Sequence, residues 1–226
     1  MKYVLITGAN GGLGFSATKL LVERGYTVFA TDVNIEDIEG IKNDKLICIQ
    51  MDVTSDESVK KAFDIVSNKT FELDAIINFA GILYMDSLIE ADLDKLSKIL
   101  EINITGVARV NKVFFPLVKT AKGRIINISS ETAYMTSPPF NGPYTMTKYA
   151  LEAYNDSLRR ELQLIGIKVI NLQLGSFKTK MHDQARESFD ELKKKTKLFN
   201  NVLGNMTKSM DREMNNNYDF KYFHKP

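Results

Sequence analysis

Tyr144 and Lys148 lie four positions apart, and this pair could carry out proton chemistry. Residues with this spacing on a helix share one face, with roughly 5–6 Å between their Cβ atoms. An ammonium at that distance favours the phenolate, so we expect Lys148 to lower the pKa of the Tyr144 phenol from its usual value of about 10. Such a phenol can serve as a proton donor to a carbonyl. A serine pair lies upstream, at Ser129 and Ser130.

A glycine-rich turn follows the first apolar segment of the chain. Thr7 ends that segment and a helix is expected from Gly12, so the glycines fall in a strand-to-helix turn. Glycines let the backbone approach a pyrophosphate, and the helix N-terminus offers N–H donors. The spacing is Gly-x₃-Gly-x-Gly, which differs from the usual dinucleotide fingerprint, and a tight turn without ligand is the alternative. The turn residues predicted to bind a cofactor are Gly8, Asn10, Gly11, Gly12, Leu13 and Gly14.

Asp32 ends the second predicted strand, 24 residues after Gly8. A carboxylate in that place can accept hydrogen bonds from the ribose hydroxyls of adenosine and repels a 2′-phosphate. No arginine or lysine stands beside it in the sequence or within the glycine turn. We therefore predict NAD(H) in preference to NADP(H). The alternative reading is a loop aspartate that caps the next turn.

Short apolar runs alternate with longer segments of helical periodicity. The predicted strands are residues 3–6, 27–30, 46–50, 75–78, 124–128 and 167–172, and the predicted helices are 12–25, 55–68, 93–119 and 143–165. The strands are almost continuously apolar, which is typical of parallel strands covered on both faces. This alternation predicts an α/β Rossmann fold, a doubly wound parallel sheet of six strands in the order 3-2-1-4-5-6 with helices on both faces. Ligands bind outside the carboxyl ends of such strands. The polar turns after the third and fourth strands therefore fall where an adenine could sit, and they contain Asp52, Val53, Asn78, Ala80 and Gly81.

The chain changes character after Gly175. Residues 176–226 are rich in Lys, Asn and Met and contain no strand-like run. Apolar positions at helical spacing predict one or two helices in this region, and they are Phe199, Val202, Leu203, Met206 and Met210. These helices could pack on the edge of the sheet or cover a substrate, because Met and Phe form an adaptable apolar surface. We treat residues 1–226 as a single domain.

Composition argues for an ordinary globular protein. The 226 residues are 44% hydrophobic and carry a net charge of +2, which suggests neither nucleic acid nor an anionic membrane as a partner. The single cysteine, Cys48, forms no disulfide within the chain and favours a reducing compartment. The apolar N-terminal run breaks at Thr7 and is too short for a signal sequence, and no stretch approaches the ~18 apolar residues of a membrane span. We expect a cytoplasmic protein, and with two histidines and no Cys/His cluster we expect no metal.

Taken in order, these segments resemble the short-chain dehydrogenase/reductase family over roughly residues 2–180. The marks are the glycine turn, Asp32, Asp52-Val53, the run from Asn78 to Gly81, Asn103, Ser130, Tyr144-x₃-Lys148 and the segment from Gly175 to Thr179. The stretch 144–161 looks like the retinol and hydroxysteroid dehydrogenase branch. The resemblance implies a doubly wound fold, an NAD(H)-dependent oxidoreductase that interconverts an alcohol and a ketone or aldehyde, and a homo-oligomer as an assembly found in such proteins.

The resemblance also implies a role for each site residue. Tyr144 would exchange the proton, Lys148 would lower the tyrosine pKa and bind the nicotinamide ribose, and Ser130 would orient the carbonyl oxygen. Asn103 would hold a water in a proton relay. Gly175 and Thr179 would contact the carboxamide.

Several positions depart from the family pattern. Phe79 replaces an asparagine, Leu174 replaces the usual proline before Gly175, and Ser130 stands 14 rather than 13 residues before Tyr144. Ser129 therefore remains an alternative to Ser130 as the residue facing the substrate. No seventh strand is predicted after residue 176.

Two other functions stay open. One is a catalytically silent dinucleotide-binding regulator of the same fold, which the absent seventh strand favours and the presence of all four catalytic residue types disfavours. The other is a nucleotide-sugar epimerase, which typically has a Gly-x₂-Gly-x₂-Gly turn and a longer substrate domain. The apolar tail, with Phe140 and Tyr84, suggests an apolar alcohol or ketone as substrate.

Overall fold

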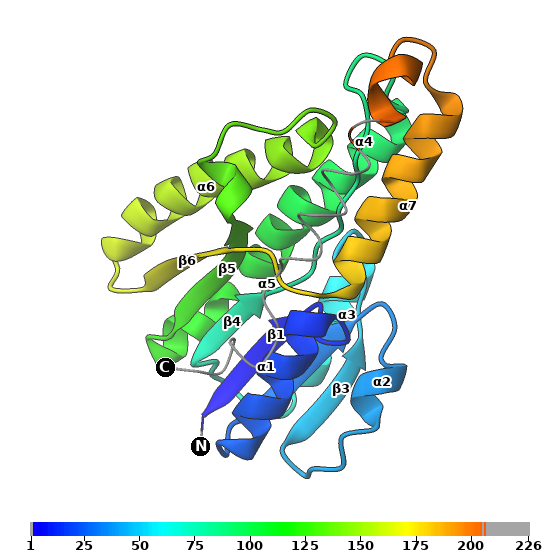
Figure 1. The fold of residues 1–226 in the computed structure, drawn as a ribbon. Coiled ribbons are helices and arrows are strands. Elements are labelled where there is room, and N and C mark those ends of the chain that lie inside the picture. Colours follow the sequence, from blue (N-terminus) through cyan, green and yellow to red (C-terminus); the bar gives the residue numbers. More distant parts are fainter. Residues whose placement is uncertain (1, 205, 207–226) are drawn as a thin grey trace.

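Six parallel strands form one sheet in the described part of this chain. The computed structural model describes residues 2–204 and 206. The strands follow one another in the order β3-β2-β1-β4-β5-β6, which confirms the predicted topology (Figure 1). Their bounds are β1 Tyr3–Thr7, β2 Thr27–Asp32, β3 Leu46–Gln50, β4 Ala75–Asn78, β5 Arg124–Ser130 and β6 Lys168–Leu174. All six run in the same direction, so their carboxyl ends share one edge of the sheet.

The helices cover the sheet because alternate strand residues point to opposite faces. The main helices are α1 Gly12–Glu23, α3 Asp56–Ser67, α4 Leu93–Leu100, α5 Gly106–Ala121, α6 Gly142–Gln163 and α7 Lys180–Lys195, with a four-residue α2 at Glu36–Glu39. On one face Leu5, Ile76 and Ile125 pack with apolar residues of α3 and α5. On the other face Val4 and Ile6 pack with residues of α1 and α2. This arrangement gives the two apolar layers of a doubly wound fold.

Several local features differ from the predictions. The predicted helix 93–119 is interrupted by a π-helical turn, η1, at Glu101–Thr105. Asn103 lies in this turn, and such turns occur often at functional sites. Helix α3 begins one residue later than predicted, because Ser55 is its N-cap and accepts a hydrogen bond from the N–H of Ser58 at 3.2 Å. Helix α2 was not predicted, since its four residues are too few to show a period.

The predicted C-terminal helices include α7, which extends along one side of the molecule from the sheet edge toward α4 (Figure 1). Phe189 and Leu192 of α7 form an apolar cluster with Leu203, against which Phe140, Phe199, Met206 and Met85 pack. Ion pairs fix α7 to neighbouring segments, among them Lys195 with buried Asp86, and Glu191 with Lys95 at 2.6 Å. Val202 is half exposed, and Met210 lies outside the described residues.

No strand follows Leu174 in the part of the chain that the structure describes. Within residues 2–204 and 206, none of the helices combines the length and the apolar character that crossing a bilayer requires.

Candidate active site

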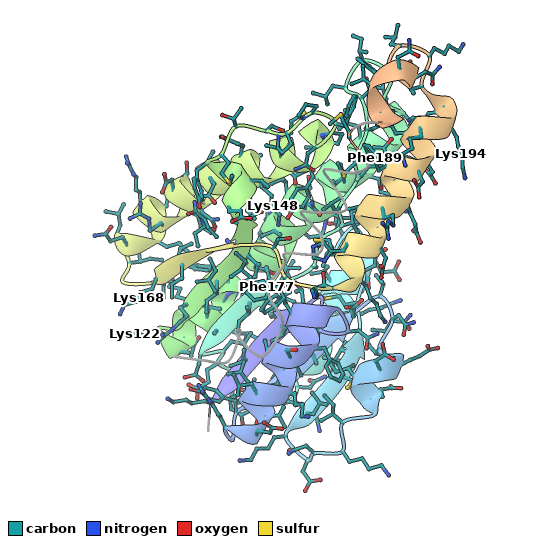
Figure 2. The ribbon with its side chains drawn as sticks, viewed as in Figure 1. Lys122, Lys148, Lys168, Phe177, Phe189 and Lys194 are labelled. Carbon is teal, nitrogen blue, oxygen red and sulfur yellow. The ribbon has the colours of Figure 1, made fainter. Side chains whose placement is uncertain are left out.

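A cavity of about 600 Å³ opens at the carboxyl edge of the sheet. Residues that follow β1, β2, β3, β4, β5 and β6 all contribute to its wall, together with the start of α6 and α7. The predicted site residues that line it are Gly8, Asn10, Gly11, Gly12, Leu13, Gly14, Asp32, Asp52, Val53, Ala80, Gly81, Ser130, Tyr144, Lys148, Gly175 and Thr179. Figure 2 shows Lys148 and Phe177 near the middle of the molecule. Lys122 and Lys168 lie instead at the amino ends of β5 and β6, away from the carboxyl edge of the sheet.

The glycine turn packs too tightly for side chains at two positions. Gly8 has a φ of +66°, and a Cβ there would lie 2.5 Å from the main-chain N of Ala80. A Cβ on Gly14 would lie 2.1 Å from the carbonyl oxygen of Gly8. Helix α1 begins directly after this turn, its N-cap Gly11 supplies no side-chain hydrogen bond, and its first turn holds no acidic residue. N–H groups at such a helix end form an anion site suited to phosphate.

Asp32 lies beside the glycine turn at the wall of the cavity. Its Oδ2 accepts a hydrogen bond from the main-chain N–H of Asn10 at 3.0 Å, and the Asn10 side chain accepts one from the N–H of Ile38 at 2.9 Å. These bonds join the turn to the end of β2. At the rim of the cavity Lys180, at the start of α7, pairs with Asp37 of α2 at 3.3 Å. Because these two residues are 143 positions apart, the sequence did not indicate their contact.

Tyr144 is buried in the first turn of α6, which begins at Gly142 and Pro143. Burial raises the pKa of Tyr144 to about 12, Glu131 adds to the rise, and a hydrogen bond with Ser130 opposes it. The predicted lowering of this pKa is therefore wrong for the protein as the structure has it, because desolvation of the phenolate has the largest effect on Tyr144. Tyr144 is accordingly a protonated phenol at neutral pH.

Lys148 is buried one helical turn further along α6, as its spacing predicted. Its Nζ lies 5.5 Å from the centre of the Tyr144 ring and donates a hydrogen bond to the carbonyl oxygen of Ile128 at 2.9 Å. Burial lowers the pKa of the ammonium to about 8, and attraction to Glu152 opposes this shift. Lys148 is therefore still mainly charged at neutral pH and loses its charge under mildly alkaline conditions.

The two serines differ in their contacts. The Ser130 hydroxyl accepts a hydrogen bond from the N–H of Thr132 at 3.3 Å and bonds to the Tyr144 phenol. The Ser129 hydroxyl is buried and has no hydrogen-bond partner among the described residues. Both side chains line the cavity. The structure thus joins Ser130, and not Ser129, to the tyrosine.

Two predicted residues do not reach the cavity wall. Asn103 is buried in η1, where its amide bonds both main-chain groups of Ile82 at 2.9 Å and the Thr147 hydroxyl at 3.1 Å. It holds the segment after β4 against α6, and its role in a water relay stays a prediction. The Asn78 side chain bonds to Asn111 and Asn127, at 2.8 and 2.7 Å, inside the protein. The Asn78 side chain therefore does not face the cavity in which we predict the cofactor.

One wall of the cavity was not predicted from the sequence. It consists mainly of apolar residues from the loop after β4 and from α7, namely Ile82, Leu83, Met85, Met181 and Ala185. His182 of α7 also lines it, accepting a hydrogen bond from the N–H of Thr179 at 3.1 Å and contacting the Ser176 hydroxyl at 3.0 Å. By contrast, Tyr84 and Phe140 are not among the residues that line the cavity. Tyr84 packs in an apolar cluster with Tyr144, and Phe140 packs against the cluster of Phe189. The helical periodicity of this wall could have placed Met181 and Ala185 on one face of α7.

Comparison with known proteins gives a consistent result. The short chain dehydrogenase family pattern matches residues 2–190. The chain is 34% identical over 187 residues to mitochondrial D-beta-hydroxybutyrate dehydrogenase of Mus musculus, covering 78% of this chain and 54% of that protein. It is 37% identical over 203 residues to retinol dehydrogenase 16 of Homo sapiens, covering 84% and 62%. The chain thus spans only about half to two thirds of the length of these relatives.

Solved structures share the fold. An alcohol dehydrogenase from the archaeon Thermococcus sibiricus, complexed with 5-hydroxy-NADP, has a TM-score of 0.74 at 25% identity, covering 80% of this chain and 78% of that one. A 3-ketoacyl-(acyl-carrier-protein) reductase from Brucella melitensis, complexed with NADH, has a TM-score of 0.76 at 21% identity, covering 84% and 81%. The second likeness concerns the fold alone.

Proposed function

The chain belongs to the short-chain dehydrogenase family, and on this premise we propose that it is an oxidoreductase that interconverts an alcohol and a ketone or aldehyde with a nicotinamide dinucleotide. The observation that carries the proposal is the grouping of Ser130, Tyr144 and Lys148 in the same cavity as a glycine turn suited to phosphate. A silent regulator is less favoured, because binding alone does not require a phenol, a hydroxyl and an ammonium in contact.

Proton transfer is assigned to Tyr144. Its phenol keeps its proton at neutral pH, so it can donate to the oxygen of a carbonyl that is being reduced. The Ser130 hydroxyl, bonded to this phenol, would hold the same oxygen in place. In the reverse direction Tyr144 would first release its proton to solvent. The resulting phenolate, stabilised by the buried Lys148 ammonium, would then accept the alcohol proton.

The predicted residues that line the cavity support the binding of a dinucleotide there. The glycine turn and the start of α1 would hold the pyrophosphate, and Asp32 would accept hydrogen bonds from the adenosine ribose. Lys148 would bind the second ribose, and the segment from Gly175 to Thr179 would contact the carboxamide. When bound, the nicotinamide supplies or accepts the hydride.

A preference for NAD(H) over NADP(H) is the finer part of this proposal. The Asp32 carboxylate would repel a 2′-phosphate. Lys180, the cation at the rim of the cavity, is already paired with Asp37. These charges support NAD(H). A solved structure of similar fold, the archaeal alcohol dehydrogenase, is nevertheless complexed with 5-hydroxy-NADP.

We propose that the substrate is an apolar alcohol or ketone. The wall formed by Ile82, Leu83, Met85, Met181 and Ala185 is apolar, and it adjoins Tyr144 in the same cavity. The two curated relatives named above are a hydroxybutyrate and a retinol dehydrogenase, so both small and large alcohols occur among such proteins.

Binding and turnover measured side by side test the function. NADH binding is followed by fluorescence, and NADH oxidation is followed with a panel of apolar ketones and aldehydes. Saturable binding together with oxidation by at least one member of the panel is expected. Binding without oxidation across the whole panel would favour the silent regulator instead.

A further inference from the structure

A layer of asparagines crosses three adjacent strands one step beyond the apolar core. Asn78 of β4, Asn127 of β5 and Asn171 of β6 are register partners across the sheet. They follow Ile76, Ile125 and Val169, which belong to the core on the same face. Buried amides must find hydrogen-bond partners, and here they find one another.

The hydrogen bonds of this layer run in a single direction. The Asn78 amide donates to Asn127 at 2.7 Å, Asn127 donates to Asn155 of α6 at 2.5 Å, and Asn155 donates to Asn171 at 2.9 Å. The Asn171 amide then donates to Oε2 of Glu152 on α6. At the other end the Thr7 hydroxyl, next to the glycine turn, donates to Asn78 at 3.4 Å. The amides thus form a head-to-tail chain that ends on a carboxylate, and such chains polarise and strengthen their members.

Glu152 lies one helical turn beyond Lys148, on the face of α6 that both share. Its second carboxylate oxygen, Oε1, is buried and accepts no hydrogen bond from any residue that the structure describes. A buried carboxylate oxygen without a donor is costly unless a charge compensates it. The nearest compensation along the helix is the Lys148 ammonium.

We propose that Glu152 is a positioning residue for Lys148: the asparagine chain fixes its carboxylate one helical turn from the buried ammonium, and the carboxylate favours the charged form of that lysine. Glu152 does not line the cavity, so it does not act on a substrate by direct contact. The consequence for catalysis rests on the proposed function, whereas the effect on the charge of Lys148 does not.

The other groups around Lys148 do not supply this charge. From β5 it meets the uncharged carbonyl of Ile128, and from its own helix it meets the ring of Tyr144. From β6, Asn171 faces Glu152 rather than Lys148. Glu131 acts on Tyr144, and among the described residues Glu152 is the charged group that supports the charged form of Lys148 by raising its pKa.

The test measures the titration of Lys148 directly in the protein without cofactor. Lysine labelled with ¹³C and ¹⁵N reports the pKa by NMR, and the Lys148→Met variant assigns the signal. Glu152→Gln keeps the shape and an acceptor for Asn171 but removes the charge. We expect the pKa of Lys148 to fall by about one unit or more in this variant. Asp156→Asn removes an exposed carboxylate from the same helix, and it should leave the pKa unchanged.

An unchanged Lys148 pKa in Glu152→Gln, or equal shifts in both variants, would overturn the proposal. If Glu152→Gln does not fold, Asn171→Ser serves instead, because it leaves the carboxylate but removes the amide that holds it. The pKa should then lie below that of the wild type, and a value equal to the wild type would contradict the proposal. The two proposals can fail separately. If the Lys148 pKa falls in Glu152→Gln but the wild-type protein shows no turnover, the role of Glu152 stands and the proposed function fails.

Discussion

The Nζ of Lys148 lies 5.5 Å from the centre of the Tyr144 ring, and both side chains are buried at the wall of one cavity. Burial acts on them in opposite directions, since it raises the pKa of the phenol to about 12 and lowers that of the ammonium to about 8. Each group is therefore pushed toward its neutral form. The pair begins, at neutral pH, as a phenol next to an ammonium.

This arrangement predicts the pH dependence of carbonyl reduction. Since the pKa of Lys148 is lowered to about 8, the ammonium is lost as the pH rises through that value, while Tyr144 keeps its proton. We expect kcat/KM to fall above about pH 8, approaching tenfold per pH unit. A pH profile from 6 to 10 with NADH checks this. A constant rate up to pH 10 would contradict it.

Replacing Lys148 by methionine should remove that pH limb. The variant loses the cation that is proposed to bind the ribose and to support proton transfer, so both the affinity for NADH and kcat should decrease. Fluorescence titration and steady-state rates at pH 7 and 9 measure these two effects. Equal affinity for NADH in the variant and the wild type would show that Lys148 does not contact the cofactor.

The paired variants Ser130→Ala and Ser129→Ala distinguish the two serines. Ser130→Ala removes the hydroxyl that contacts Tyr144 and should reduce kcat by about 10²-fold or more, as the loss of a positioned donor does. Ser129→Ala removes a buried hydroxyl that has no partner among the described residues, so activity and stability should be retained. The reverse pattern in steady-state assays would make Ser129 the residue that faces the substrate.

Removing the charge of Asp32 should relax the choice of cofactor. Asp32→Asn retains an acceptor for the N–H of Asn10 but no longer repels a 2′-phosphate. We expect the ratio of kcat/KM for NADPH to that for NADH to rise about tenfold, which corresponds to about 1.4 kcal/mol. Asp64→Asn, at an exposed position of α3, is the control. A wild-type protein that uses NADPH as well as NADH would contradict the assignment.

Gly14→Ala tests the close packing of the glycine turn. The added Cβ would lie 2.1 Å from the carbonyl oxygen of Gly8, so the turn must shift. We expect the free energy of unfolding to fall by about 1–3 kcal/mol, together with weaker binding of NADH. Gly204→Ala places a Cβ that meets no described residue within 4 Å outside its own helix backbone, and it should cost no stability. Denaturant unfolding and fluorescence titration of both variants provide the comparison.

Local patterns in the sequence were sufficient to predict the order of the strands and many of the residues that line the cavity. The apolar runs predicted the six strands of the sheet. The glycine turn, Asp32 and Tyr144 lie at ends of strands or helices that meet at one edge of this sheet. The topology of a doubly wound sheet therefore brought distant motifs together without further information.

The remaining features depend on contacts between distant segments. Lys180 reaches Asp37 across 143 positions, and the apolar wall needs α7 to fold back over the loop after β4. The pKa of Tyr144 follows from burial, which spacing along a helix does not show. Asn78 belongs to a familiar motif, yet its amide serves the interior chain that leads to Glu152.

The central claim is that the Tyr144 phenol provides the proton in carbonyl reduction. Tyr144→Phe keeps the ring and removes the hydroxyl, so a single-turnover measurement with bound NADH isolates the chemical step. We predict a loss of about 10²–10⁴-fold or more in the rate of NADH oxidation, with NADH affinity within about twofold of the wild type. A variant that binds NADH and oxidises it at the wild-type rate would contradict the account.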